Sequence, residues 1–265
     1  EIVVEEQAHI YNAEAGSIAV LAGCLARPVP SKRGMLEWEQ IEPFLHFKPT
    51  RLNPTGLITI ENTHNKAGGT VMEPEHCATI CRKAHSVGLP VHLDGARIFN
   101  AATALGTTVV DLTRHCDSVT FCLSKGLCAP VGSMLIGSDD FIEEALQIRK
   151  LVGGAMRQVG VLAAAGLIAL EDMPKRLFQD HENARFLAEA LDELVGLRID
   201  LESVQTNIVM VDVEYMSAAE FLGKMKEEGV LVGALTDKRV RFVTHKDVSR
   251  QDIQKTIDTI RQIEA

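Results

Sequence analysis

The sequence lacks an apolar run that could cross a membrane. Its longest such run, Val161 to Leu170, is too short for a bilayer, which requires about 20 residues. It also lacks the basic, then apolar, then small-residue start that directs secretion. Clustered cations are absent too: 27 scattered Lys and Arg face 36 Asp and Glu, for a net charge of −9, which argues against a nucleic-acid surface. We therefore expect a cytoplasmic protein without membrane or nucleic-acid partners.

Dinucleotide-binding and low-complexity signatures are also missing. No G-x-G-x-x-G follows any predicted strand, so the sequence gives no support to a dinucleotide site. A chain of 265 residues that is 46% hydrophobic and 24% charged is neither a disordered tail nor a collagen-like fibre. Its length permits one large or two ordinary domains.

The six cysteines include no C-x-x-C pair. The spacing of Cys77, Cys81 and His85 stacks three metal-ligand types on one helix face, so a metal site has to be weighed there. However, Cys81 also belongs to an ordinary apolar helix stripe with Ile80 and Ala84. The sequence therefore assigns no metal ligands and leaves metal binding open, and we expect the thiols to be reduced core residues.

Strands and helices alternate along most of the chain, which predicts an α/β fold. Short buried strands separated by helices indicate a mostly parallel sheet wrapped by helices. The strands are expected at 1–5, 57–60, 90–93, 118–122 and 133–136, and the helices at 74–87, 139–151 and 155–170. A further helix is expected from Pro174 to about Leu191.

The C-terminal part has a different pattern. Strands at 207–213 and 239–243 alternate with helices at 217–228 and 249–263, and Ser249 with Asp252 resembles a capping box. This pattern suits a small α+β domain. We place the boundary near residue 172, giving a large domain over 1–172 and a small C-terminal domain over 173–265.

Polar residues follow three of the predicted strands. The runs are 61–65, 92–97 and 122–126, and ligands of open α/β sheets bind at such strand ends. Taken singly, Lys125 reads as a surface lysine and Asp94 as a turn residue. Together, a lysine and an aspartate on neighbouring strands suit pyridoxal 5′-phosphate (PLP). The amine binds its aldehyde, and the carboxylate keeps the pyridinium nitrogen protonated.

Longer runs around these residues resemble a known family. Ile60 to Asn65, His92 to Asn100, Leu123 to Leu127, Gly153 to Gln158 and Arg241 to His245 are similar to the low-specificity threonine aldolases. These are PLP enzymes with the aspartate-aminotransferase fold, also called fold type I. The resemblance extends over the whole chain, and it implies that fold, including a smaller C-terminal α+β domain.

The resemblance also implies roles for individual residues. Lys125 would hold the cofactor covalently, Asp94 would pair with its ring nitrogen, and His9 would stack on its ring. Without the resemblance, His9 is an ordinary loop residue. Ser124 and Arg157 would contact the cofactor phosphate, the latter from a neighbouring subunit.

The substrate contacts implied by the resemblance involve three further residues. Arg97 and Arg241 would clamp the carboxylate of the amino acid, as the guanidinium fork suits. By strand alternation alone, Arg241 could equally be an outward-facing charge. His64 would lie near the β-hydroxyl group, either as the base or as the holder of a water that acts as base.

The implied activity is cleavage of L-threonine and L-allo-threonine to glycine and acetaldehyde, a lyase reaction of threonine catabolism and glycine biosynthesis. The implied assembly is a homo-oligomer, a dimer or tetramer. A serine hydroxymethyltransferase-like enzyme is an alternative. The sequence contains no recognisable folate site, which weighs against it. The family's phosphate-binding Gly-Thr loop does not precede Glu1. An inactive truncated scaffold, or a form that binds PLP poorly, is therefore a further alternative.

Overall fold

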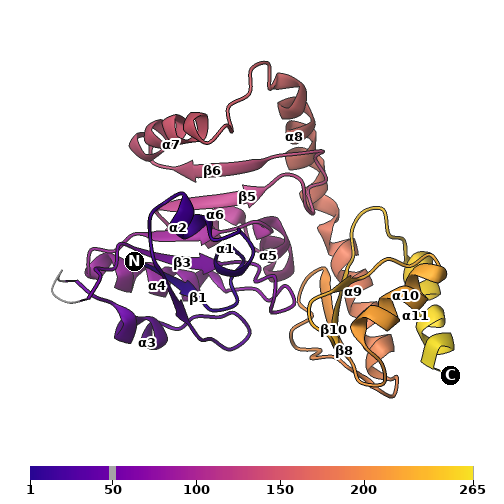
Figure 1. The fold of residues 1–265 in the computed structure, drawn as a ribbon. Helices are drawn as coiled ribbons and strands as arrows, with labels where there is room; N and C mark the ends of the chain where they lie inside the picture. Colours follow the sequence, from indigo (N-terminus) through magenta and orange to yellow (C-terminus); the bar gives the residue numbers. More distant parts are fainter. Residues whose placement is uncertain (48–51, 265) are drawn as a thin grey trace.

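Two β-sheets organise the chain in the computed structural model, which describes residues 1–47 and 52–264 (Figure 1). The first sheet has six strands in the order β2-β1-β3-β4-β5-β6. The first five are parallel, and β6 runs antiparallel to β5. The strands are β1 (Ile2–Glu5), β2 (Ala26–Val29), β3 (Leu57–Glu61), β4 (Val91–Asp94), β5 (Ser118–Cys122) and β6 (Ser133–Gly137).

Helices connect these strands, as the alternating pattern predicts. Those of the first part are α1 (His9–Asn12), α2 (Ser17–Val20), α3 (Trp38–Ile41), α4 (Pro74–Ser86), α5 (Ile98–Leu105), α6 (Val109–Thr113), α7 (Asp139–Leu151) and α8 (Gly160–Asp172), with a 3₁₀ turn at Glu42–Phe44. Helix α4 begins at Pro74, whose fixed φ suits a first turn. Its buried face, including Cys77 and Ile80, joins the core formed with β1, β3, β4 and β5.

The second sheet is smaller and antiparallel, with the order β7-β8-β10-β9. Its strands are β7 (Leu197–Arg198), β8 (Ile208–Val213), β9 (Gly233–Ala234) and β10 (Arg239–Val243), and it packs with α9 (Leu177–Asp192), α10 (Ala218–Glu227) and α11 (Arg250–Glu264). The predicted capping box is present: Asp252 N–H donates to Ser249 Oγ at 3.2 Å, and Ser249 N–H donates to Asp252 Oδ2 at 2.8 Å.

Two predicted elements differ from the structure. The helix expected from residue 155 begins only at Gly160, after a loop in which Gly153 and Gln158 have positive φ. The helix expected from Pro174 begins as a 3₁₀ turn, Met173–Arg176, before α9. Proline lacks the N–H group that an α-helix interior would use, which accounts for the tighter turn there.

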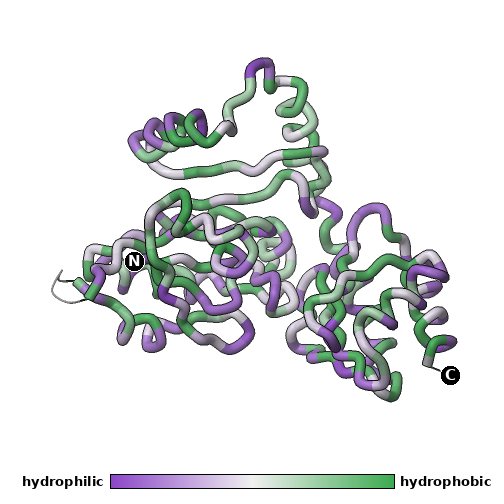
Figure 2. The backbone as a smooth tube through the Cα atoms, viewed as in Figure 1, coloured by the Kyte–Doolittle hydropathy of each residue, from purple (hydrophilic) through white to green (hydrophobic). Residues whose placement is uncertain are grey.

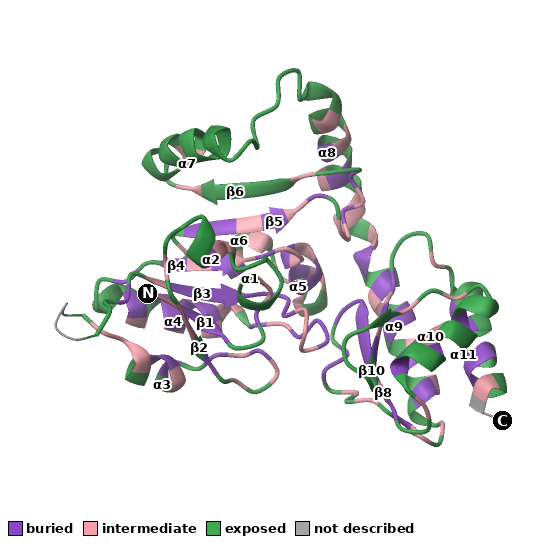
Figure 3. Cartoon of the chain, in the orientation of Figure 1, coloured by how far each residue is buried: buried purple, intermediate pink, exposed green. Residues whose placement is uncertain are grey.

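Strand β6 is exposed, although a buried strand is predicted at that position. It is an edge strand bonded to β5 alone, and Met134, Leu135 and Ile136 remain 44%, 38% and 50% exposed. Figure 2 shows apolar residues along β6 and α8, and Figure 3 shows much of these elements and of α7 as exposed. The apolar composition therefore marks a surface here, and not the inside of this chain.

Candidate active site

The three polar runs come together at one edge of the large sheet. Strands β3, β4 and β5 are parallel neighbours, with Glu61 beside Asp94 and Asp94 beside Thr120. Past the strand end, Gly95 N–H donates to Thr120 O at 2.8 Å, so the β4 loop continues along β5. The predicted carboxyl-edge cluster is therefore present.

Lys125 lies in the loop that follows β5. Its backbone oxygen accepts from Cys128 N–H at 2.9 Å, which closes a turn around it. Lys125 is half-buried, and its amine has no hydrogen-bond or ion-pair partner in the part of the chain that the structure describes. The residue that follows, Gly126, has to be small, because an added Cβ there would lie 2.9 Å from Asn100 Oδ1. The lysine is thus held by its backbone while its side chain is left available.

Asp94 ends β4 on the strand beside β5. Its Oδ1 atom accepts from Ala96 N–H at 3.0 Å. This contact fixes the carboxyl group at the strand end, and Oδ2 accepts no hydrogen bond from the described residues. A carboxylate oxygen at this edge is suitably charged for a protonated ring nitrogen.

Arg97 and Arg241 converge on a single amide oxygen. Arg97 Nη1 donates to Asn65 Oδ1 at 3.2 Å, and Arg241 Nη1 donates to the same atom at 3.0 Å. Arg241 comes from β10 of the small sheet, whereas Arg97 follows β4 of the large one. The pKa of Arg97 is lowered, mainly because the side chain is buried and secondly because the positive charge of Arg241 lies nearby.

No carboxylate of the described residues neutralises this arginine pair by a direct contact. The Arg241 Nε atom is buried and has no hydrogen-bond partner among them. Two cations that share a neutral acceptor, with an unused buried donor, form a strong site for an anion. The geometry therefore supports the clamp, and it argues against an outward-facing Arg241.

Glu61 connects two segments of this site. Its buried carboxylate accepts from His9 N–H at 2.7 Å through Oε2, and from Asn65 N–H at 2.8 Å through Oε1. The His9 ring is 38% exposed and lies 2.6 Å from Glu14 through Nε2. The sequence reasoning assigned no role to Glu61 or Asn65. The one sequence feature that pointed to both residues was their position in the polar run after β3.

His64 is buried and fully hydrogen-bonded. Its Nδ1 atom accepts from Ala67 N–H at 3.2 Å, so Nε2 carries the proton that it shares with Glu5 Oε2 at 2.9 Å. Burial would raise the pKa of Glu5, but hydrogen bonds from His64, Ser31 and Gln7 N–H outweigh it and lower that pKa. The structure thus places His64 beside Asn65 in the chain, without a free ring nitrogen.

Ser124 and Arg157 are not brought together. Ser124 is exposed next to Lys125, whereas Arg157 lies in the exposed loop between α7 and α8. Figure 1 shows where α7 and α8 lie relative to β5. Within the described residues, no contact joins Arg157 to the other candidate residues. Contact of Arg157 with the phosphate from a neighbouring subunit stays a prediction.

Comparison with known proteins agrees with this geometry. The family model for beta-eliminating lyases matches residues 1–215. The chain belongs to this family. It is 37% identical over 268 residues to low-specificity L-threonine aldolase 1 of Arabidopsis thaliana, covering 99% of this chain and 75% of the relative. It is 41% identical over 256 residues to the low specificity L-threonine aldolase of Escherichia coli O157:H7, covering 96% and 74%. The resemblance to the low-specificity threonine aldolases is confirmed.

Solved structures confirm the fold of this family member. The Leishmania major threonine aldolase matches with a TM-score of 0.81 at 19% identity, covering 100% of this chain and 77% of that one. The histidinol-phosphate aminotransferase of Clostridium acetobutylicum matches with a TM-score of 0.72 at 16% identity, covering 99% and 77%. The predicted PLP-enzyme fold type I is thus correct. In the described part of the chain, no helix has the length and apolar content to cross a membrane.

Proposed function

We propose that this chain is a PLP-dependent aldolase that cleaves L-threonine and L-allo-threonine to glycine and acetaldehyde. The observation that carries the proposal is the meeting of Arg97 and Arg241 on Asn65, with a buried Arg241 donor left unused. This site suits the carboxylate of an amino acid, at the sheet edge that also holds a lysine and an aspartate.

The residues present fit PLP. Lys125 offers an amine without a protein partner among the described residues, and Asp94 offers a carboxylate on the adjacent strand. When bound, PLP supplies a ring that accepts the electron pair of the breaking Cα–Cβ bond. Lys125 would hold the cofactor and Asp94 would keep its ring nitrogen protonated. His9, at the start of α1, would stack on the ring, and Ser124 and a partner-supplied Arg157 would contact the phosphate.

Arg97 and Arg241 would orient the amino acid. A carboxylate entering between them would replace Asn65 Oδ1 as their acceptor and would reach the unused Nε donor of Arg241. Charge-assisted, bidentate contacts of this kind fix direction as well as affinity. Because the arginines come from different sheets, they hold the substrate between the two parts of the chain.

His64 has a positioning role in this proposal. To act as the base, or to hold a water that does so, it would have to release Glu5 or the Ala67 N–H group. With both contacts in place, it anchors the turn that carries Asn65. His9 is half-exposed at this edge, and its Nε2 atom would have to release Glu14 before it could approach a hydroxyl proton.

The first experiment is a visible absorption spectrum of the purified chain with added PLP. We expect a band of lysine-bound cofactor that Lys125→Ala removes and that Lys150→Ala, an exposed control on α7, retains. Acetaldehyde release from L-threonine would then establish the reaction. A band without acetaldehyde, but with folate-dependent serine cleavage, would favour the hydroxymethyltransferase alternative. Absence of a band would contradict the proposal and favour the alternative of an inactive truncated scaffold.

The proposal extends to a cytoplasmic homo-oligomer, a dimer or tetramer. Six free cysteines suit a reducing compartment. The exposed apolar residues of β6, α7 and α8 support self-association, because such patches are uncommon on monomers.

A further inference from the structure

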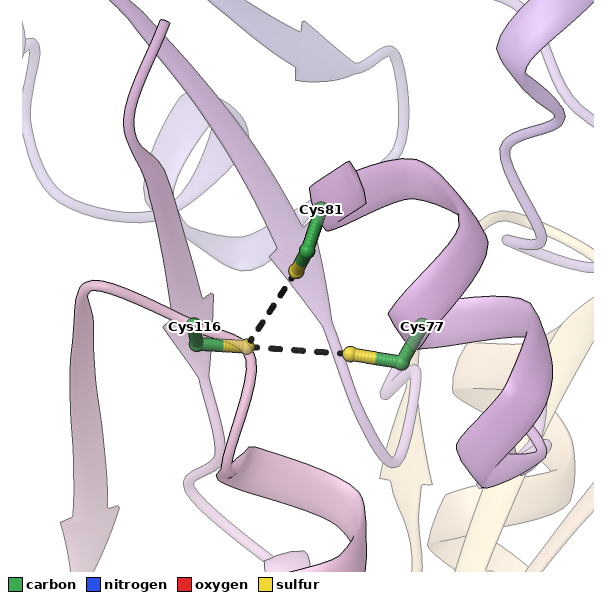
Figure 4. A group of neighbouring side chains, drawn as sticks. All are labelled: Cys77, Cys81 and Cys116. Carbon is green, nitrogen blue, oxygen red and sulfur yellow. Dashed lines mark hydrogen bonds between the residues drawn. The ribbon is translucent and has the colours of Figure 1, made fainter. Parts of the chain in front are cut away.

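Three cysteines meet at the opposite edge of the large sheet from Lys125. Cys77 and Cys81 lie one turn apart on α4, and Cys116 lies in the segment between α6 and β5 (Figure 4). The Cys116 Sγ atom is 3.6 Å from that of Cys77 and 3.9 Å from that of Cys81. All three sulfur atoms lie within 4.8 Å of one another.

The backbone holds these side chains in place from two directions. Cys116 N–H donates to Thr113 O at 2.9 Å, and the next residue, Asp117, donates its N–H to Val91 O at 2.9 Å. Asp117 Oδ2 also accepts from Val91 N–H at 2.7 Å, which ties the segment to the start of β4. The cysteines of α4 are fixed by the helix itself, so the cluster is preorganised.

The sulfur spacing matches a metal-thiolate site. A zinc–sulfur bond of about 2.3 Å implies a spacing of roughly 3.8 Å between sulfur atoms around a tetrahedral ion. The two measured separations, 3.6 and 3.9 Å, bracket that value. A disulfide would join two of the three sulfurs and leave the third unpaired, whereas one ion engages all three.

The structure also changes the set of ligands that the sequence pattern suggests. His85, the third residue of the helical spacing, turns away, with Nε2 2.8 Å from Asp117 Oδ2. Cys116, distant in sequence from α4, takes the third position instead. This substitution turns a mixed set on one helix into three thiols from two elements, a softer donor set.

We propose that Cys77, Cys81 and Cys116 bind one thiophilic divalent ion of the zinc group, Zn²⁺ or Cd²⁺. Binding replaces three thiol protons with three metal–sulfur bonds and releases the protons to solvent. Cys77 and Cys81 are buried, whereas Cys116 is only half-buried, so the fourth position opens beside Cys116 and takes water. The ion would join α4 to the β4 and β5 layer. Because β5, about 15 Å long, separates this cluster from Lys125, the site is distinct from the proposed active site.

Zn²⁺ titration of the purified chain against a chromophoric chelator tests this proposal. We expect one ion per chain, with affinity falling more than about 100-fold in Cys116→Ser, since even outer-shell partners contribute 10- to 100-fold. Cys128→Ser is the matched control, because Cys128 is also half-buried but lies outside the cluster. Equal binding by the two variants would overturn the proposal.

A second measurement needs no variant and therefore does not depend on how Cys116→Ser folds. Cd²⁺ added to the parent chain should give thiolate-to-metal absorption that corresponds to three sulfurs per ion. A value of one or two sulfurs, or recovery of the cluster as a disulfide after purification under reducing conditions, would contradict the proposal. Neither experiment involves PLP or threonine, so failure here leaves the proposed aldolase function intact, and the reverse also holds.

Discussion

Arg241 shows most clearly how a single residue can reveal a ligand. A strand arginine normally extends into water, as Arg239 does on the same strand, where it pairs with Asp212 at 2.6 Å. Arg241, in contrast, has a buried Nε without a partner among the described residues, and a second guanidinium beside it. Burying an unsatisfied donor costs free energy, which an entering carboxylate would recover.

We therefore expect Arg241→Gln to weaken binding of threonine more than it slows turnover. The loss of a charge-assisted contact, about 1.5–3 kcal/mol, corresponds to a rise in KM of roughly 10- to 100-fold. Steady-state kinetics of acetaldehyde release measures it, with Arg239→Gln as the control two residues earlier. An unchanged KM in Arg241→Gln would exclude the carboxylate clamp.

At the level of elements, α9 and α5 meet through a buried polar junction. Asn100 of α5 lies 3.1 Å from His181 Nε2 of α9, and its Nδ2 donates to Asn207 Oδ1, just before β8, at 3.4 Å. The same asparagine packs against Gly126, next to Lys125. Burial lowers the pKa of His181 from 6.5 to about 4, so this histidine is neutral in the folded chain at pH 5, whereas it is charged in the unfolded chain.

This difference predicts that stability falls on acidification. Between pH 6.5 and about 4 the unfolded chain binds a proton at His181 that the folded chain does not bind, so the free energy of unfolding decreases as pH falls. The contribution between pH 7 and pH 5 is about 2 kcal/mol. Urea unfolding at both pH values should show a smaller loss for His181→Asn than for the parent. His115→Asn, an exposed control, should lose as much unfolding free energy between pH 7 and pH 5 as the parent. If His181→Asn loses as much as the parent, His181 is not the source of the acid sensitivity.

At the scale of the whole molecule, the surface formed by β6, α7 and α8 is unusually apolar. No α7 residue is buried among those described, and Leu151, Val161 and Leu167 are 81%, 73% and 62% exposed. Burial of such side chains contributes about 25 cal/mol per Å² of apolar surface. The proposed homo-oligomer offers one way to remove this surface from water.

We expect Leu167→Asp to shift the assembly toward smaller species in sedimentation velocity, because a charge placed in an apolar interface is costly. Val195→Asp is the control: Val195 is 86% exposed as well, but it follows α9 in the C-terminal part. If both variants sediment like the parent, the α8 surface is not part of an interface between copies.

Local sequence patterns determined most elements and most of the chemistry of this protein. Strands β3, β5 and β10, helix α4 and the Ser249 cap follow from short apolar runs, a first-turn proline and capping residues that lie close together in the chain. The meeting of the polar runs at one sheet edge follows as well, since parallel strands align their carboxyl ends. Assignment of the family required the residues around Lys125, Asp94 and His64, together with the runs 153–158 and 241–245.

Tertiary structure alone decided which side chains share a contact. Asn65 receives Arg97 and Arg241 from two sheets, Glu5 holds both His64 and Ser31, and Cys116 replaces His85 beside the cysteines of α4. Each of these contacts joins residues far apart in the chain, so no local period or spacing encodes it. The exposure of β6 is not encoded locally either, because an apolar strand has the same sequence pattern whether or not a neighbouring element covers it. Packing between distant segments, which depends on the whole fold at once, set these outcomes.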